Sequence, residues 1–430
     1  MNKLNPINLF RIARGSTNSM IFFLSFSNIF GNGLTIISGL FVAKWMIPEE
    51  LGAFNVFSII TGYIVLIQLG IPSGLSRELP FYIGRNEKGT AINYASVAQY
   101  WQKGLGLVLL SATILIAFVF LSQKNYQTAA GITVVGITTW HTLYVTKYLK
   151  ILYRSNRDFN KLSWIKIINS LFLFFSIVLV WLYGFYGLCI RAILAALVDF
   201  IFTYKWRPIT TKPKWNRLHF IDLFRLGLPM FAIANIFNLW PIIQKTLIVT
   251  LGGTKALGLF VIAIMVENSM KTVTKSISGV MYPTMSISWG KGATVGEMVK
   301  LVMKPLIIGL ILFCLLAPLA WWLLPIFIES ILPNYIEGIQ AARWMIIVGI
   351  LGLANVFSNY YNVVKDQLNR LKLYLGGIIT WAITVLILFQ KDGFSLVIFP
   401  QAMVLAMLVM IIINYYHIKK NWSSIAPSNG

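Results

Sequence analysis

Long apolar stretches alternate with short connectors along this chain, and nearly all of the positive charge falls on every second connector. Hydrophobic residues make up 57% of the 430 residues and charged residues only 11%, a composition that water-soluble domains do not have. Apolar runs of about 18 residues or more are typical of membrane-spanning helices. The pattern therefore predicts an all-α integral membrane protein that crosses the bilayer many times.

We expect twelve transmembrane helices, each near the roughly 20 residues that cross a hydrocarbon core of about 30 Å. They are predicted at 18–43, 56–76, 95–122, 128–147, 162–183, 186–204, 223–250, 257–284, 301–324, 343–364, 373–390 and 394–416. The fourth and tenth differ from the others because they carry polar residues such as His141 and Asn355.

Lysine and arginine divide the connectors into two sets. The N-terminus, the even-numbered connectors and the C-terminus hold most of these residues. The odd-numbered connectors and their flanks hold only Lys44, Lys124, Lys255, Arg343 and Lys391. Because basic residues in short loops stay in the cytoplasm, both termini are predicted to be cytoplasmic. The net charge of +23 is then mainly a topology signal with some attraction to anionic membrane lipids, and no nucleic-acid partner is expected.

Residues that bind metals or cofactors do not cluster in the sequence. His141, His219 and His417 are scattered without metal-ligand spacing, and Cys189 and Cys314 both fall in predicted spans. A Gly-rich phosphate loop followed by Lys and Ser or Thr is absent from the sequence. We therefore expect no metal, no cofactor and no ATPase activity. The first apolar run is too long for a signal peptide and is expected to remain as the first helix.

The longest basic connector, about 205–222, divides the chain into two lobes of six helices, 1–212 and 213–430. A short motif recurs in both halves: Leu51-Gly52-Ala53-Phe54 and Leu257-Gly258-Leu259-Phe260 each end the first outer connector. Six spans per half give both halves the same orientation, as in parallel repeats related by an axis along the membrane normal. This organisation predicts a transporter with a central cavity.

Three segments resemble a known family. Leu40–Phe54, with its turn Pro48-Glu49-Glu50-Leu51-Gly52-Ala53-Phe54, resembles the first outer loop of polysaccharide flippases of the Wzx type. Leu69–Pro80 is similar to the second helix of that family, and Lys245–Gly252 followed by Leu257–Phe260 is similar to its seventh helix and turn. The family usually has an acid before the basic residue of the seventh helix, whereas this chain has Gln244.

The resemblance implies a bacterial flippase for O-antigen or capsule repeat units, within the multidrug/oligosaccharidyl-lipid/polysaccharide exporter superfamily. It implies a MATE-like fold of two six-helix lobes that works by alternating access. The implied cargo is an oligosaccharide linked to a polyprenyl diphosphate, moved from the inner to the outer leaflet of the cytoplasmic (inner) membrane. Polymerase and chain-length proteins of the same pathway are implied as partners.

Ionisable groups on the eighth span are the main site prediction. Glu267, Lys271 and Lys275 fall at i, i+4 and i+8, on one helical face. Glu267 lies about ten residues into this span, roughly 15 Å at about 1.5 Å per residue, which is near the bilayer centre. A cationic stripe in a cavity suits a diphosphate group, and a structural ion pair between Glu267 and Lys271 is the alternative. Lys166 and Arg191 lie near span ends and are expected to extend to the membrane surface.

Further candidates complete the predicted site. The other cavity-facing residues are Lys103, Lys245, Asn28, Asn32, Asn235 and Asn238. A phosphate could be drawn to the cytoplasmic mouth by Arg14, Arg77 and Arg85. Kinks in the seventh span are predicted at Pro229 and Pro241.

Two other functions share parts of this sequence pattern. A MATE-type ion-coupled exporter of small organic molecules has the same architecture, but organic cations call for carboxylates, and only Glu267 and Asp199 are deep acids here. An enzyme such as a polysaccharide polymerase or ligase needs a sizeable outer loop with catalytic Arg or His. The longest outer connector, about 325–342, is short and holds Glu329 and Glu337 but no histidine. The sequence therefore favours a flippase over an enzyme.

Overall fold

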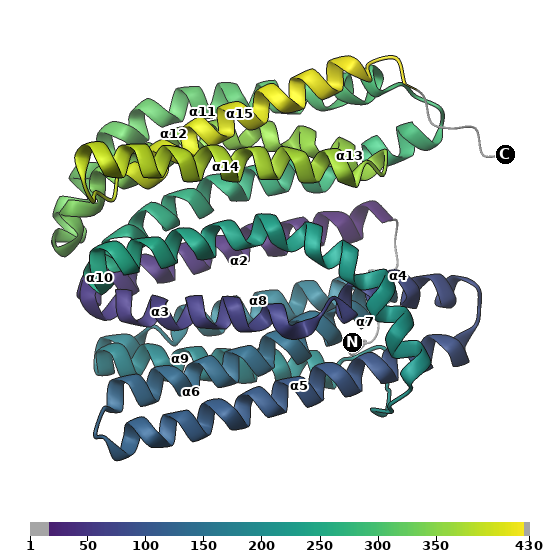
Figure 1. The fold of residues 1–430 in the computed structure, drawn as a ribbon, viewed down its shortest axis with the longest axis horizontal. Coiled ribbons are helices and arrows are strands. Elements are labelled where there is room, and N and C mark those ends of the chain that lie inside the picture. Colours follow the sequence, from purple (N-terminus) through teal and green to yellow (C-terminus); the bar gives the residue numbers. More distant parts are fainter. Residues whose placement is uncertain (1–16, 425–430) are drawn as a thin grey trace, which may run out of the picture. The chain divides into compact units, whose positions relative to one another are not determined.

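The computed structural model describes residues 17–424, and at 17–22, 25, 234, 280 and 283 it describes the backbone only. These residues form helices joined by short turns, with no β-strand among them (Figure 1). The first helices are α2 (Thr17–Trp45), α3 (Pro48–Ile64), η1 (Val65–Gln68), α4 (Ile71–Gly84), α5 (Lys88–Ser122), α6 (Tyr126–Trp140), η2 (His141–Leu149), α7 (Lys150–Ser155), α8 (Phe159–Phe175) and α9 (Val178–Lys205). They are followed by α10 (Arg217–Gly290), α11 (Val295–Ile331), η3 (Pro333–Gly338), α12 (Ile339–Gly352), η4 (Leu353–Ser358), α13 (Asn359–Val363), α14 (Gln367–Asp392) and α15 (Ile398–Lys420).

The chain forms two compact units. Unit 1 comprises Met1–Met46 and Phe54–Asn235, and unit 2 comprises Ile47–Ala53 and Ile236–Gly430. Within unit 1, α5 packs along α6 and α2 along α8; within unit 2, α14 packs along α15 (Figure 1). The division between the units falls inside α10, and the first turn of α3 groups with unit 2. The lobes 1–212 and 213–430 remain a prediction.

A sharp bend divides α10 into two arms. The backbone leaves the helical region at Gly253, with φ 77° and ψ −177°. Only glycine adopts a positive φ without a steric penalty, so this residue allows the chain to reverse between two long apolar helices. The bend coincides with the connector that the sequence predicts between the seventh and eighth spans.

The repeated Leu-Gly motif packs against itself in unit 2. A Cβ atom on Gly52 would lie 1.8 Å from the carbonyl oxygen of Thr254, and a Cβ on Gly258 would lie 1.8 Å from that of Pro48. Thr254 precedes Gly258 by four residues, and Pro48 precedes Gly52 by the same number. The contact is therefore reciprocal, backbone against backbone, and no residue larger than glycine fits either position without a shift.

Irregular helix occurs in the two spans that carry unusual polar residues. His141 opens η2, a nine-residue π-helical segment that continues α6. Asn355 lies in η4, a 3₁₀ segment that joins α12 to α13. Such segments change the direction of side chains along a helix and are frequent at functional sites.

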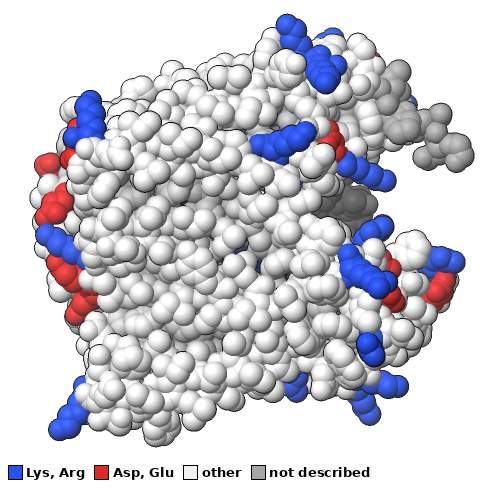
Figure 2. Space-filling view, viewed as in Figure 1, with Lys and Arg blue, Asp and Glu red and all other residues white. Residues whose placement is uncertain are grey.

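The surface between the helix ends is apolar. Nine helical stretches of the described residues are long and apolar enough to cross a membrane, and one of them, Asn235–Gly290, contains the bend at Gly253. Large hydrophobic side chains on these helices are open to the surroundings, including Leu115 at 68% and Leu315 at 69% exposure. Charged side chains gather at the helix ends, and a broad, largely uncharged band lies between them (Figure 2). A soluble surface does not expose such a band, so the chain is a multi-pass membrane protein.

Candidate functional site

The second arm of α10 brings three predicted residues to one pocket in unit 2. Glu267, Lys271 and Lys275 line a cavity of about 280 Å³. Their four-residue spacing places them on successive turns of one helical face, as the sequence predicts. Residues from the first arm of α10 and from α12, η4, α13, α14 and α15 complete the wall, and α14 adds the guanidinium of Arg370. The lining therefore carries three cationic side chains and one carboxylate.

Glu267 and Lys271 form an ion pair at the pocket wall. Lys271 Nζ lies 2.5 Å from Glu267 Oε1, one turn along α10. The Glu267 side chain is only 10% exposed, whereas that of Lys271 is 34% exposed. The carboxylate is thus enclosed by protein while the ammonium still reaches the cavity.

Arg370 is held in place by its neighbours on α13 and α14. Its Nη1 donates to Oδ1 of Asn362 at 2.6 Å, and its Nε donates to the hydroxyl of Tyr374 at 3.2 Å. Its Cζ also lies 5.3 Å from the centroid of the Tyr374 ring. A guanidinium fixed in this way presents a planar group of donors, which suits phosphate oxygens. The sequence placed Arg370 in a basic connector and gave no reason to assign it to a cavity.

The other predicted cavity residues are distributed over both units. Lys245 is half-buried on the first arm of α10 and interacts electrostatically with Glu267. Lys103 lines a separate pocket of unit 1, beside Trp101. Asn28 lines another pocket of unit 1, and Asn32 is half-buried on the same helix.

The asparagines and prolines of the seventh span are all within α10. The side chain of Asn235 donates to the carbonyl of Phe231 at 2.8 Å, within the helix, and Asn238 is exposed. Helical structure continues through Pro229 and Pro241. The kinks at these two prolines remain a prediction.

The predicted cytoplasmic arginines have acidic neighbours. Arg77 Nε lies 3.9 Å from Glu78 Oε1, and Arg85 Nε lies 3.0 Å from Glu87 Oε1. Both arginines are exposed: Arg77 lies midway along α4, and Arg85 follows the last residue of this helix as its C-cap. Arg14 lies outside the described residues.

Arg191 does not extend to the surface as predicted. Its Nε and Nη2 donate to the carbonyl oxygen of Leu173 at 3.2 and 2.9 Å, and Nη2 also donates to Ser38 Oγ. Arg191 therefore joins α9 to α8 and α2 within unit 1. The carbonyl is available because α8 ends at Phe175, which leaves its last carbonyl groups without helical partners.

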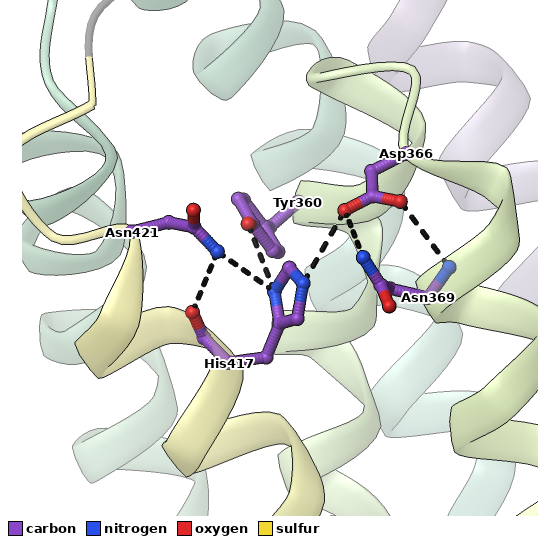
Figure 3. Close-up of polar contacts among 5 residues, drawn as sticks. All are labelled: Tyr360, Asp366, Asn369, His417 and Asn421. Atoms are coloured by element: carbon purple, nitrogen blue, oxygen red, sulfur yellow. Dashed lines mark hydrogen bonds and ion pairs between the residues drawn. The ribbon is translucent and has the colours of Figure 1, made fainter.

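A second polar cluster closes the end of unit 2 where α14 begins and α15 ends (Figure 3). His417 Nδ1 lies 3.1 Å from the Tyr360 hydroxyl and 3.3 Å from Nδ2 of Asn421, and Nε2 lies 3.3 Å from Asp366 Oδ2. An amide nitrogen can only donate, so Nδ1 is the acceptor and Nε2 carries a proton toward Asp366. Asp366 also caps α14 by accepting from the backbone N–H of Asn369 at 3.2 Å. These groups bind one another, and we interpret the cluster as structural.

The fold is that of the MATE transporters. An inward-facing multidrug resistance MATE family transporter of the MOP superfamily matches with a TM-score of 0.72 over 92% of this chain and 97% of that one, at 15% identity. An outward-facing structure of such a transporter gives 0.65 over 95% and 97%, at 16% identity. A MOP superfamily transporter from Pyrococcus furiosus, described as having a binding pocket of reverse polarity, gives 0.63 over 95% and 97%, at 16% identity.

The sequence identifies the family within this fold class. Residues 41–313 match the pattern of the polysaccharide biosynthesis protein family. A comparison with curated proteins gives no match. The family match covers more than half of the chain, so the chain belongs to the polysaccharide biosynthesis protein family, in agreement with the resemblance seen in its sequence.

Proposed function

We propose that the protein is a flippase that carries a polyprenyl-diphosphate-linked oligosaccharide, an O-antigen or capsule repeat unit. The cargo moves from the inner to the outer leaflet of a bacterial cytoplasmic membrane by alternating access. The observation that carries this proposal is the cationic lining of the unit 2 pocket, which contains Lys271, Lys275 and Arg370 together with the carboxylate of Glu267.

The charge of this pocket suits an anionic cargo. An ionised group within a membrane protein is costly unless it has a partner or a function. Glu267, the one acidic side chain among the described residues that line the pocket, is paired with Lys271, so it offers little to a cationic ligand. Two further cations remain in the lining to face a diphosphate, and charge-assisted bonds to phosphate are strong. The pocket therefore favours a flippase over an exporter of organic cations.

The pocket size and lining suit a head group whose lipid tail stays in the bilayer. A cavity of about 280 Å³ accommodates a diphosphate with part of a sugar. Phe237 and Tyr374 line it with stacked rings whose centroids are 4.6 Å apart, and such rings offer an apolar face to a sugar. The polyprenyl chain and remaining sugars would lie outside the cavity.

Our proposal includes the predicted topology of twelve spans with both termini in the cytoplasm. Three features support this number: the bend at Gly253 within one of the nine apolar stretches, and the helices α6 and α8, which have 15 and 17 residues. The protein would act as a transporter and not as an enzyme, beside polymerase and chain-length proteins of its pathway.

The proposal is tested in a host that lacks this gene. The lipid-linked oligosaccharides are extracted, the leaflet that holds them is probed, and the surface polysaccharide is measured. We expect completed lipid-linked units to accumulate on the cytoplasmic side and the surface polymer to be lost, with both restored by the wild-type gene. Normal lipid-linked pools and surface polymer, in a host without a second flippase, would reject the proposal. Increased sensitivity to organic cations in that strain would then favour the exporter of small organic molecules.

A further inference from the structure

Unit 1 contains a second polar pocket, of about 300 Å³, which the proposed function does not use. It lies between α2, α7, α8 and α9. Its polar lining consists of Asn28, Lys150, Arg154, Lys166, Asn169 and Asp199. Three of these side chains are cationic and one is a carboxylate, the same balance as in the pocket of unit 2.

Asp199 is already neutralised by neighbouring side chains. Its Oδ2 accepts from Lys150 Nζ and from His141 Nε2, each at 2.8 Å. The carboxylate is 2% exposed, so it is matched within the protein and offers little to a cation entering the pocket. The field in the cavity is therefore set by the excess of basic groups and attracts anions.

The pocket also contains a polar group that lacks a partner. Oδ1 of Asn169 is buried and has no hydrogen-bond partner within the described part of the chain. Buried polar groups are normally satisfied, which points to a ligand or water at this position. Because an amide can present either its oxygen or its NH₂ group, Asn169 can donate to an oxyanion after a simple rotation.

Gly31 on α2 provides the space that Lys166 occupies. A Cβ at residue 31 would lie 2.8 Å from Lys166 Cε and 2.7 Å from Ser170 Oγ. The stem of Lys166 therefore lies against the α2 backbone, beside the pocket. The expectation that Lys166 extends to the membrane surface stays a prediction.

We propose that this pocket binds a phosphate-bearing anion, with Arg154 and Lys166 as its principal cationic contacts. In the proposed topology the connector after α7 is cytoplasmic, so the site is reached from the inner leaflet. The further step that this pocket binds the transported lipid rests on the proposed function. In that case the pocket of unit 1 would bind the diphosphate of an incoming substrate, and the pocket of unit 2 would be a separate site. The same chemistry would also suit the head group of an anionic phospholipid.

Binding is measured on the purified full-length protein. Inorganic pyrophosphate is titrated by calorimetry, and polyprenyl diphosphate and phosphatidylglycerol are added separately in nanodiscs and counted by native mass spectrometry. We expect Arg154→Gln and Lys166→Met each to weaken pyrophosphate binding about tenfold, because each removes a charge-assisted contact. Lys161→Met is the matched control: Lys161 lies near the pocket on α8 but pairs with Asp158 at 3.0 Å. Lys271→Met provides the comparison for the unit 2 pocket.

A second series moves Lys166 without removing its charge. We expect Gly31→Ala to weaken binding, because the new methyl group must displace the Lys166 side chain. Adding Gly31→Ala to Lys166→Met should cost little more than Lys166→Met alone. Gly33→Ala is the control on the same helix, since a Cβ at Gly33 meets nothing within 4 Å. Melting temperatures in detergent identify any variant that is simply unfolded.

The outcomes separate the site from the proposed function. If pyrophosphate and polyprenyl diphosphate compete for binding, and the Arg154 and Lys166 variants bind both more weakly, the pocket is supported as a substrate site. If the protein retains phosphatidylglycerol but not polyprenyl diphosphate, and the same variants weaken that retention, the pocket is supported as a site for the head group of an anionic phospholipid. Wild-type binding by the Arg154, Lys166 and Gly31 variants would overturn the inference. If transport is normal in the deletion host while the Arg154 and Lys166 variants bind pyrophosphate more weakly in vitro, the flippase function is rejected and the anion site is still supported.

Discussion

Lys271 Nζ lies 2.5 Å from Glu267 Oε1, on successive turns of α10, and the two side chains differ in exposure. The carboxylate is enclosed, while the ammonium borders the cavity. An ion pair arranged in this way can position the lysine as well as neutralise it. Lys271 can therefore be both the ion-pair partner of Glu267 and a contact of the ligand. The effect of substituting both residues on transport distinguishes a lysine that binds ligand from one that only neutralises Glu267.

We predict that Lys271→Gln reduces transport at least tenfold without changing the amount of protein in the membrane, because a cation facing the cargo is lost. Glu267→Gln leaves the Lys271 side chain at the cavity and should retain more transport. If Lys271 binds cargo, the double variant Glu267→Gln/Lys271→Gln will remain as impaired as Lys271→Gln. The measurement is the leaflet distribution of lipid-linked oligosaccharides, with immunoblots for protein level.

Lys300→Gln is the control for this series, since Lys300 is an exposed residue of α11. Recovery of transport in the double variant would show that the lysine serves only to neutralise Glu267. Wild-type transport by Lys271→Gln would exclude both roles.

The reciprocal glycine contact predicts equal sensitivity at two distant positions. Gly52→Ala and Gly258→Ala should each lower the free energy of unfolding by about 1–3 kcal/mol, because each places a methyl group against a backbone carbonyl that cannot easily move. Thermal unfolding of the purified protein in detergent measures the effect. Gly104→Ala on α5 should be neutral or stabilising, because a Cβ there meets nothing within 4 Å. Unchanged stability of both variants would mean that the two turns do not pack this closely.

Arg191 should be a structural residue. Arg191→Met removes the donors that bind the Leu173 carbonyl and Ser38, and we expect a loss of about 1–3 kcal/mol of stability. Arg191→Lys should rescue only part of it, because an ammonium cannot reproduce the planar set of donors. Thermal unfolding again provides the measurement, with Arg217→Met as the control at an exposed position. A variant as stable as the wild type would restore the expectation that Arg191 simply extends to the surface.

The cluster around His417 should stabilise the end of unit 2. His417→Ala leaves Asp366, Tyr360 and Asn421 without their shared partner, and we expect a loss of about 1–3 kcal/mol. Tyr416→Ala is the control, since this neighbour is exposed at 70%. Hydrogen exchange at the start of α14 should increase in the His417 variant and not in the control. Equal exchange in both would show that the cluster contributes nothing to the order of that end.

The sequence predicted those parts of the site that depend on one helix. Glu267, Lys271 and Lys275 share a face because of helical periodicity alone, and the structure places all three at one pocket. Arg370 joins them from a helix nearly 100 residues later, and its position depends on packing that no local pattern encodes. The Leu-Gly repeat is visible in the sequence, but the sequence does not reveal that its two copies are in contact.

The contacts of basic residues near the helix ends do not follow from their positions in the sequence. Lys166 and Arg191 occupy positions from which a long side chain can reach the membrane surface. For Lys166, the decisive neighbour is Gly31 on another helix. For Arg191, it is a carbonyl group made available where α8 ends. Both depend on distant backbone geometry, which a sequence position does not reveal.

The contact between Gly52 and Gly258 also bears on the ancestry of the chain. Two copies of one motif that meet through the same atoms in both directions have the form of an isologous interface, as in a two-fold symmetric dimer. A half-length chain with a single Leu-Gly motif could pair with a second copy through this contact. Duplication and fusion of its gene would preserve the interface inside one polypeptide, and the surrounding side chains could then diverge while both glycines were kept.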